Sequence, residues 1–147
     1  VMPTNQDGLG TSSFPEDTFW PLHNFVLKSF ENEGVYFSDV LIDRSFPHEN
    51  KPTRKPGTGM FGKYINNPAY DLDNSYVIGD RITDIQLAKN LGCKGIWINN
   101  DANLGAAEIQ DQVTELRATT IALETTEWKK IYEFLKLGLR TVHHERN

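Results

Sequence analysis

Two carboxylates, Asp80 and Asp84, are the sharpest chemical signal in this sequence. They lie four positions apart in a Gly-Asp-Arg-Ile-Thr-Asp segment that directly follows the short apolar stretch 75–78. A pair with this spacing can converge on one hard cation such as Mg²⁺, which is usually held by one or two carboxylates, water and substrate phosphate. Alternatively, Asp80 is a turn residue and Asp84 favours a helix N-terminus.

Two further polar segments could serve phosphate chemistry. Lys55 could act as a point charge for phosphate at the end of a long loop, and Arg54 as a planar fork. Near the N-terminus, a hydroxyl and two amides are contiguous. They belong to Thr4, Asn5 and Gln6. The alternative in both segments is a solvated loop whose side chains satisfy their own backbone.

Strands and helices are expected to alternate along the chain, which predicts a mainly parallel sheet with helices on both faces. The expected strands are one ending near residue 4 and those at 35–42, 75–78, 94–98 and 119–123. The expected helices are one from about 14–17 to Gly34, 60–65, 83–91, a short one at 106–110, and a last one ending at Leu137. Ligands bind beyond the carboxyl ends of such strands, and the three polar segments all lie there.

Composition limits the function further. A chain of 147 residues with 38% hydrophobic content suits one compact domain. The net charge of −5 argues against nucleic acid and anionic membranes as partners. No apolar run approaches the ~20 residues that span a bilayer. The single cysteine, Cys93, excludes an internal disulfide framework and favours a reducing, cytoplasmic setting.

A hydroxyl, a lysine and a carboxylate pair therefore follow successive strands in that chain order. The segments at 4–11, 54–56 and 75–88 resemble the histidinol-phosphate phosphatase domain of the haloacid-dehalogenase-like superfamily. That domain occurs in a bifunctional histidine-biosynthesis enzyme whose second domain is imidazoleglycerol-phosphate dehydratase. The resemblance covers most of residues 1–98, and it implies a Rossmann-like α/β fold.

The resemblance also implies roles for individual residues. Thr4 would hold the transferred phosphoryl group, and Lys55 would neutralise the phosphoaspartate and its nucleophile. Asp80 would bind Mg²⁺, and Asp84 would fix either a metal-bound water or Lys55. Three more side chains would lie near the substrate: Asn5, Gln6 and Arg54.

The implied reaction is Mg²⁺-dependent hydrolysis of L-histidinol phosphate through an aspartyl-phosphate. One alternative is a sugar-phosphate phosphatase of the heptose-bisphosphate kind. Another, from a different class, is a non-catalytic phosphate-binding or interaction module. The dehydratase-like residues 139–147 favour histidine biosynthesis, and we interpret them as a linker toward a dehydratase domain after a truncated phosphatase domain at 1–138.

The sequence departs from the family pattern at two places. The first motif, Asp-x-Asp-Gly-Thr on the central strand, is absent, so this chain alone is predicted to be inactive. Relatives often carry a Cys/His cluster before Arg-Lys-Pro, but residues 43–53 contain no cysteine. We therefore expect no structural zinc, and the loop must be ordered in another way, its prolines being one candidate.

Overall fold

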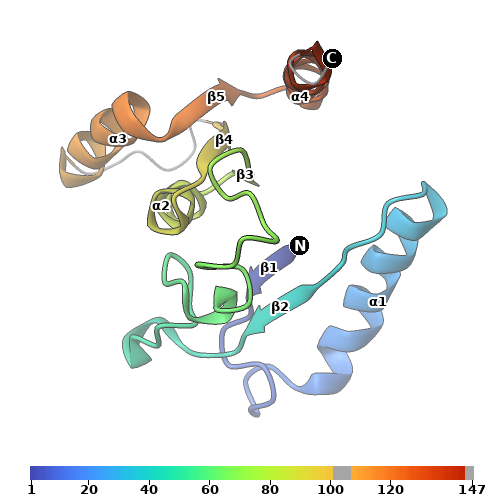
Figure 1. Ribbon diagram of the computed structural model, residues 1–147. Coiled ribbons are helices and arrows are strands. Elements are labelled where there is room, and N and C mark those ends of the chain that lie inside the picture. Colours follow the sequence, from blue (N-terminus) through green and yellow to red (C-terminus); the bar gives the residue numbers. More distant parts are fainter. Residues whose placement is uncertain (101–106, 145–147) are drawn as a thin grey trace. The chain divides into compact units, whose positions relative to one another are not determined.

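The computed structural model describes residues 1–100 and 107–144, and these divide into two units, Val1–Lys63 and Tyr64–Asn147 (Figure 1). The strands are β1 (Met2–Asn5), β2 (Val40–Asp43), β3 (Tyr76–Gly79), β4 (Lys94–Ile98) and β5 (Ile121–Thr125). The helices are α1 (Glu16–Asn32), α2 (Ile82–Leu91), α3 (Ala107–Thr119) and α4 (Trp128–His144). Two short 3₁₀ helices are η1 (Pro47–Glu49) and η2 (Gly59–Phe61). No helix among the described residues is long and apolar enough to cross a membrane.

The first unit is built on a parallel pair of strands. In the register of β1 and β2, Thr4 lies opposite Ile42 and Asn5 lies opposite Asp43. The connecting helix α1 has two acidic residues, Glu16 and Asp17, in its first turn, where they interact favourably with the positive end of the helix dipole. Its buried side chains include Phe19, which is 6% exposed.

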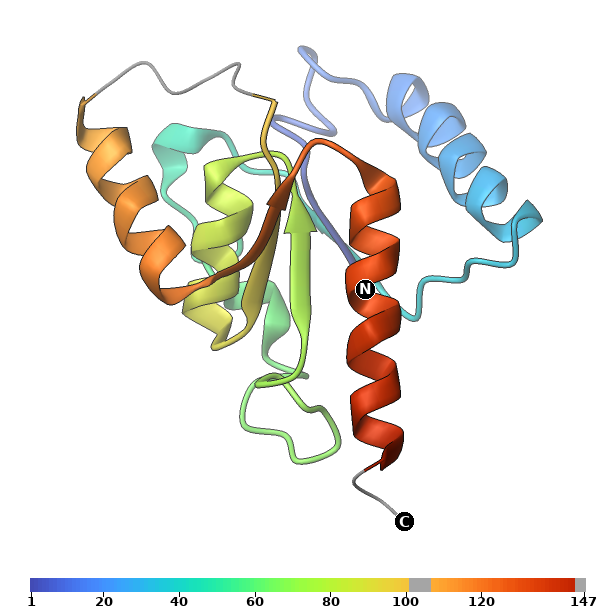
Figure 2. The same cartoon turned by 90° about the horizontal axis from the view of Figure 1, so that it is seen from above.

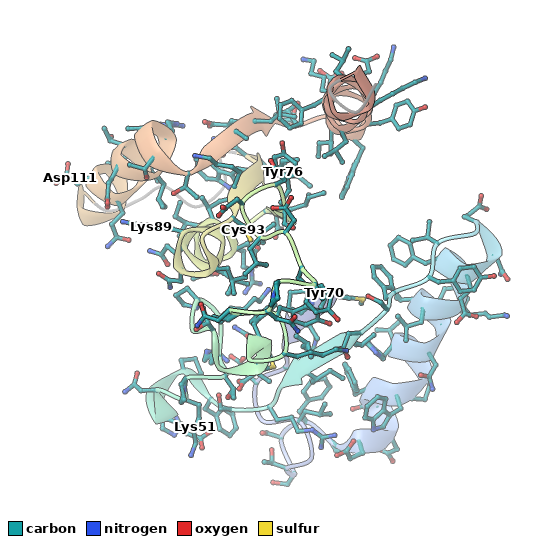
Figure 3. The ribbon with its side chains drawn as sticks, viewed as in Figure 1. Lys51, Tyr70, Tyr76, Lys89, Cys93 and Asp111 are labelled. Atoms are coloured by element: carbon teal, nitrogen blue, oxygen red, sulfur yellow. The ribbon has the colours of Figure 1, made fainter. Side chains whose placement is uncertain are left out.

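The second unit is a three-stranded parallel sheet in the order β3–β4–β5. Figure 2 shows α2 and α3 on one face of this sheet and α4 on the other. The core cluster lies between the sheet and the first pair of helices. It consists of Ile85, Trp97, Val113 and Leu116. On the opposite face, the Tyr76 ring of β3 packs edge-on against Phe134 of α4, with 5.6 Å between ring centroids (Figure 3).

These observations confirm the predicted α/β class with parallel strands. The described strands form two sheets, β1–β2 and β3–β4–β5, and β1 and β3 are edge strands of their respective sheets. On β3, Tyr76 and Ile78 remain 40% and 39% exposed, although strands of parallel sheets are ordinarily covered on both faces. The proposed central strand, which would carry the first motif, stays a prediction.

Two predicted elements are shorter in the structure. Residues 60–65 do not form a helix: η2 ends at Phe61 and turns follow it. A helix this short lacks the residues to offset nucleation, and Asn66 adopts a left-handed φ of 55°. The expected strand 35–42 is reduced to Val40–Asp43, preceded by residues outside regular structure.

Two helices are longer than predicted. The structure has α3 up to Thr119, whereas the sequence predicted only a short helix at 106–110, of which residue 106 lies outside the described residues. Val113 and Leu116, three positions apart, bury one stripe of an otherwise polar helix. The last helix continues to His144 rather than Leu137, and so includes part of the predicted linker.

The core of the second unit predicts a contrast between two leucines. Leu116 is 2% exposed and Leu137 is 65% exposed. In the full-length natural polypeptide, Leu116→Ala should lower the free energy of unfolding by about 2–5 kcal/mol, because it leaves a cavity. Leu137→Ala, the matched control, should cost less than about 1 kcal/mol. Urea denaturation measures both, and equal losses would contradict the assigned core.

Candidate active site

Two reciprocal hydrogen bonds join the first and second polar segments in the first unit. The Lys55 amide donates to Asn5 Oδ1 at 3.1 Å, and Asn5 Nδ2 donates to the Lys55 carbonyl at 3.4 Å. Asn5 is the last residue of β1, directly after Thr4. The structure therefore fixes the main chain of Lys55 at the end of the strand that carries the predicted phosphoryl-binding hydroxyl.

Gln6 orients that hydroxyl. Its Nε2 donates to Thr4 Oγ at 2.8 Å. Because Thr4 Oγ accepts this bond, its own O–H can donate to an anion such as a phosphate oxygen. Gln6 was predicted to lie near the substrate, and the structure places it beside Thr4.

The Arg54 side chain is held by a neighbouring carboxylate. Its Nη1 and Nη2 donate to the two oxygens of Asp7 at 2.5 and 3.2 Å, and Nη1 also donates to the Ser45 carbonyl at 2.8 Å. This fork-to-fork geometry orients the guanidinium more strongly than a single hydrogen bond would. The chain turns at Asp7 and Gly8. Gly8 does adopt a φ of +72°, and an added Cβ would lie 2.3 Å from the Phe46 ring.

A residue that the sequence reasoning missed, Asp43, anchors the long loop. It ends β2 and is 4% exposed. Burial raises the pKa of this carboxyl, but hydrogen bonds from Ser45 and Thr53 and the charge of Arg54 outweigh that effect, so the pKa lies below its usual value. An Asp at a strand end with Ser two positions later is a typical Asx-turn pattern, which could have indicated the contact.

In the second unit, the main chain of Asp80 is anchored to the neighbouring strand. The indole Nε1 of Trp97 on β4 donates to the Asp80 carbonyl at 3.2 Å. The guanidinium of Arg117 lies 5.6 Å from the Trp97 ring centroid, and it also donates two hydrogen bonds to Glu124. These contacts explain how a buried tryptophan, 3% exposed, fixes the first residue after β3.

Asp84 lies in the first turn of α2 and is 7% exposed. One of its carboxylate oxygens accepts a hydrogen bond from the Arg81 amide at 3.2 Å. This contact stabilises the helix N-terminus, which is the alternative that the sequence left open for Asp84. A role beside a metal, or toward Lys55, stays a prediction.

The donor set of the second unit suits magnesium. Asp80 is exposed, and Asp84, four positions later in the sequence, is buried. Both side chains offer carboxylate oxygens as ligands. Among the described residues no group of three or more His, Cys, Asp or Glu side chains could hold a metal ion. Mg²⁺ fits such a site because it needs few protein carboxylates and retains water.

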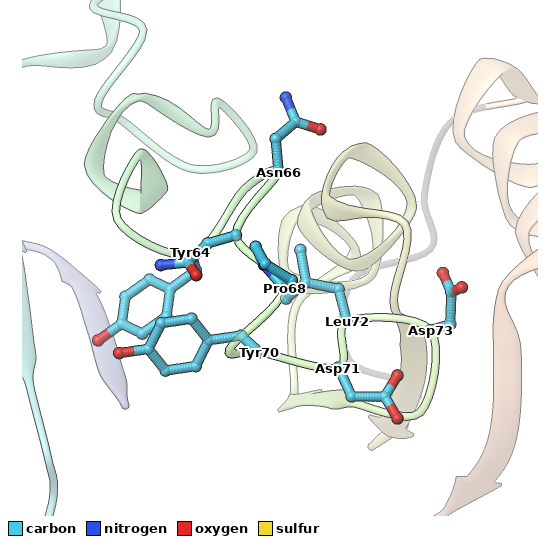
Figure 4. A pocket seen from close by; sticks show the side chains of 8 residues that line it. Tyr64, Asn66, Pro68, Tyr70, Asp71, Leu72 and Asp73 are labelled. Atoms are coloured by element: carbon cyan, nitrogen blue, oxygen red, sulfur yellow. The ribbon is translucent and has the colours of Figure 1, made fainter.

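An open pocket of about 380 Å³ lies elsewhere in the second unit, in the segment before β3. Figure 4 shows the rings of Tyr64 and Tyr70 side by side, while Asp71 and Asp73 point away from them. Because this segment enters β3 at its amino end, the pocket is separate from Asp80, which follows the carboxyl end. It is not part of the candidate active site.

The chain is similar to known proteins over most of its length. Residues 52–122, which include Lys55, Asp80 and Asp84, match a family described as HAD-hydrolase-like. The chain is 53% identical over 146 residues to the Histidine biosynthesis bifunctional protein HisB of Bacteroides fragilis. It is 54% identical over 149 residues to the protein of that name from Spirosoma linguale. These alignments cover 99% and 100% of this chain. Residues 52–122 of the chain thus have the sequence pattern of HAD-like hydrolases.

The chain spans 37% and 39% of the length of those two relatives. Among solved structures, this HAD-like chain is similar to D,D-heptose 1.7-bisphosphate phosphatase from B. bronchiseptica, crystallised with magnesium and phosphate. The TM-score is 0.56 at 25% identity, and the match covers 65% of this chain and 53% of that one. The predicted haloacid-dehalogenase-like fold is thereby confirmed.

Gly79 tests the packing at the carboxyl end of β3, where α2 begins. A Cβ at Gly79 would lie 2.3 Å from Asp84 Oδ2 and 2.5 Å from Asp84 Cβ. Gly79→Ala should therefore displace the start of α2 and lower stability by about 1–3 kcal/mol. The control is Gly62→Ala, where a Cβ would meet nothing within 4 Å. Thermal unfolding of the full-length polypeptide compares them, and two unchanged melting temperatures would disprove the close packing.

Proposed function

We propose that the full-length protein containing this chain is a Mg²⁺-dependent phosphatase that hydrolyses L-histidinol phosphate to L-histidinol and phosphate. The observation that carries the proposal is the reciprocal pair of hydrogen bonds between Asn5 and Lys55. It holds a lysine at the end of the strand that bears Thr4, in the chain order that the HAD-like phosphatases use. The names of the relatives that are 53–54% identical support histidine biosynthesis.

In this proposal each residue stabilises charge or position, which is most of what phosphoryl transfer requires. The Thr4 hydroxyl donates to a phosphoryl oxygen, and the Lys55 ammonium neutralises the negative charge of the phosphate and the nucleophile. Asp80 holds Mg²⁺, which when bound supplies further neutralisation of the phosphate oxygens. Asp84 orients a water or Lys55. Three residues are proposed to flank the substrate: Asn5, Gln6 and Arg54.

The nucleophile in this mechanism is an aspartate carboxylate on a strand that precedes Thr4 in the folded protein. It attacks phosphorus, the P–O bond to histidinol breaks, and histidinol leaves with a proton from a general acid. Water then hydrolyses the aspartyl-phosphate and releases phosphate. We propose that residues 1–138 form the phosphatase part and that 139–147 lead to a dehydratase domain in the same polypeptide, located in the cytoplasm.

A second candidate substrate class is favoured by the solved structure of the heptose-bisphosphate phosphatase. The same residues would perform the same chemistry on a sugar phosphate. The higher identity to the histidine-biosynthesis proteins, 53% against 25%, supports L-histidinol phosphate as the first candidate substrate.

Phosphate release from L-histidinol phosphate by the full-length polypeptide tests the proposal. Chelation of Mg²⁺ should abolish turnover. Lys55→Ala and Asp80→Asn should each lower kcat/KM by about 100-fold or more, because each removes charge stabilisation of the transition state. The matched control is Lys51→Ala, since Lys51 is an exposed lysine in the same loop and should tolerate substitution (Figure 3).

The outcomes separate the three candidate functions. Turnover of a heptose bisphosphate but not of L-histidinol phosphate would retain the mechanism and reject the pathway. Phosphate binding without turnover of either substrate would favour the non-catalytic module. Equal activity of Lys51→Ala and Lys55→Ala would reject the assigned role of Lys55.

The 147-residue chain by itself should release no phosphate. Its sequence contains no Asp-x-Asp-Gly-Thr segment, so the attacking carboxylate of the proposed mechanism is missing. The measurement is turnover of the purified 147-residue chain beside the full-length polypeptide under the same Mg²⁺ concentration. Comparable rates would show that a different residue acts as nucleophile.

A further inference from the structure

The loop between β2 and Lys55 must be ordered if Lys55 is to meet a phosphate reproducibly. It contains two prolines, Pro47 and Pro52, and no cysteine. Within the described part of the chain, it holds no cluster of three metal-ligating side chains. Hydrogen bonds to the end of β2 can supply that order.

The Asp43 carboxylate closes this loop at both ends. Its Oδ1 accepts hydrogen bonds from the Ser45 amide at 3.0 Å and from the Ser45 hydroxyl at 2.5 Å. Its Oδ2 accepts from the Thr53 hydroxyl at 2.5 Å. One buried carboxylate thus binds the residue two positions after it and the residue ten positions after it. Hydrogen bonds to an ionised acceptor are shorter and stronger than those between neutral groups.

The residues bound by Asp43 are adjacent to the predicted phosphate-binding residues. Thr53 directly precedes Arg54 and Lys55 in the chain. The Ser45 carbonyl accepts a hydrogen bond from Arg54 Nη1. Asp43 therefore influences the position of Arg54 in two ways. Thr53 is joined to Arg54 through the main chain, and the Ser45 carbonyl binds the Arg54 side chain.

The returning chain is packed closely against the same loop. The Gly57 amide donates to the Arg54 carbonyl at 2.7 Å, and the Gly59 amide donates to the Pro52 carbonyl at 2.8 Å. A Cβ at Gly57 would lie 2.3 Å from the Pro52 oxygen. The turn that contains Lys55 is thus a compact unit whose attachment to β2 includes the Thr53–Asp43 hydrogen bond.

We propose that Asp43 is a positioning residue that, through Ser45 and Thr53, sets the placement of Arg54 and Lys55 without a structural metal. This inference rests on the proposed phosphatase function for its kinetic consequence, while the ordering of the loop is measurable independently of any activity. Asp43 is not itself expected to contact the substrate.

The experiment uses the full-length polypeptide and four variants. Asp43→Ala removes the acceptor, and Thr53→Val removes one donor at nearly constant volume. Thr53→Ser restores the hydroxyl. The control is Thr18→Val, since the Thr18 hydroxyl donates to the carbonyl of Pro15, the residue before α1, which lies outside residues 43–56. Hydrogen–deuterium exchange of peptides covering 43–56 reports the order of the loop.

Exchange in this segment should accelerate in Asp43→Ala and Thr53→Val, and it should match wild type in Thr53→Ser and Thr18→Val. With L-histidinol phosphate, kcat/KM should fall about tenfold to a hundredfold in the first two variants, as expected for misplaced reacting groups. The serine variant should recover most of the loss, which a change in overall stability alone would not produce.

Unchanged exchange in both Asp43→Ala and Thr53→Val would overturn the ordering role. Faster exchange with unaltered kcat/KM would overturn the link to Lys55. If wild type releases no phosphate, the proposed function fails and the kinetic link fails with it, but the exchange results still decide whether Asp43 orders the loop. If Asp43→Ala does not fold, Thr53→Val and Thr53→Ser carry the test.

Discussion

The parallel pairing of β1 with β2 continues past the ends of both strands, and the order of the first unit depends on that continuation. The Gln6 amide donates to the Asp43 carbonyl at 2.7 Å, and the Gly8 amide donates to the Arg44 carbonyl at 3.0 Å. The two loops that follow β1 and β2 therefore remain hydrogen-bonded to each other beyond the strands. Buried main-chain groups require such partners, so the polar side chains on these loops inherit fixed positions.

The register also explains why one pair of residues holds the returning loop. Asn5 and Asp43 lie opposite each other at the last position of the two strands. Asn5 binds the main chain of Lys55, and Asp43 binds the hydroxyl of Thr53. The adjacent ends of the two strands thus bind two nearby residues of the loop, Lys55 and Thr53. In the second unit, strand pairing likewise fixes a residue after a strand, since the indole of Trp97 on β4 donates a hydrogen bond to the Asp80 carbonyl after β3.

Elements with strong apolar patterns could be predicted from the sequence. Helix α2 and strand β4 were expected at nearly their observed bounds, since a buried face gives a clear period and Gly92 ends the helix with a φ of +76°. Helix α3 was largely missed, because only a narrow stripe of a polar helix is buried. The predicted helix at 60–65 was wrong because the apolar residues of this segment have helical spacing, whereas the chain forms turns there.

The sequence indicates candidate site residues where the signal is local, but it does not predict contacts between residues distant in sequence. Thr4 and Asp80 stand out because each lies at or directly after the carboxyl end of a strand. The contact between Asn5 and Lys55 joins positions fifty residues apart, and no local pattern announces it. Asp43 carried a local turn signal, but its bond to Thr53 depends on how the intervening loop closes.

The pairing of Arg54 with Asp7 gives the guanidinium an internal counter-ion. The Arg54 side chain is 18% exposed and its guanidinium already contacts a carboxylate, so the pair contributes little net field to an approaching anion. Long-range attraction would then come chiefly from lysine, while the arginine offers direction through its rigid plane. An arginine paired in this way discriminates between ligands by their geometry rather than by long-range attraction. A ligand that had to displace the Asp7 carboxylate from Arg54 would bind more weakly.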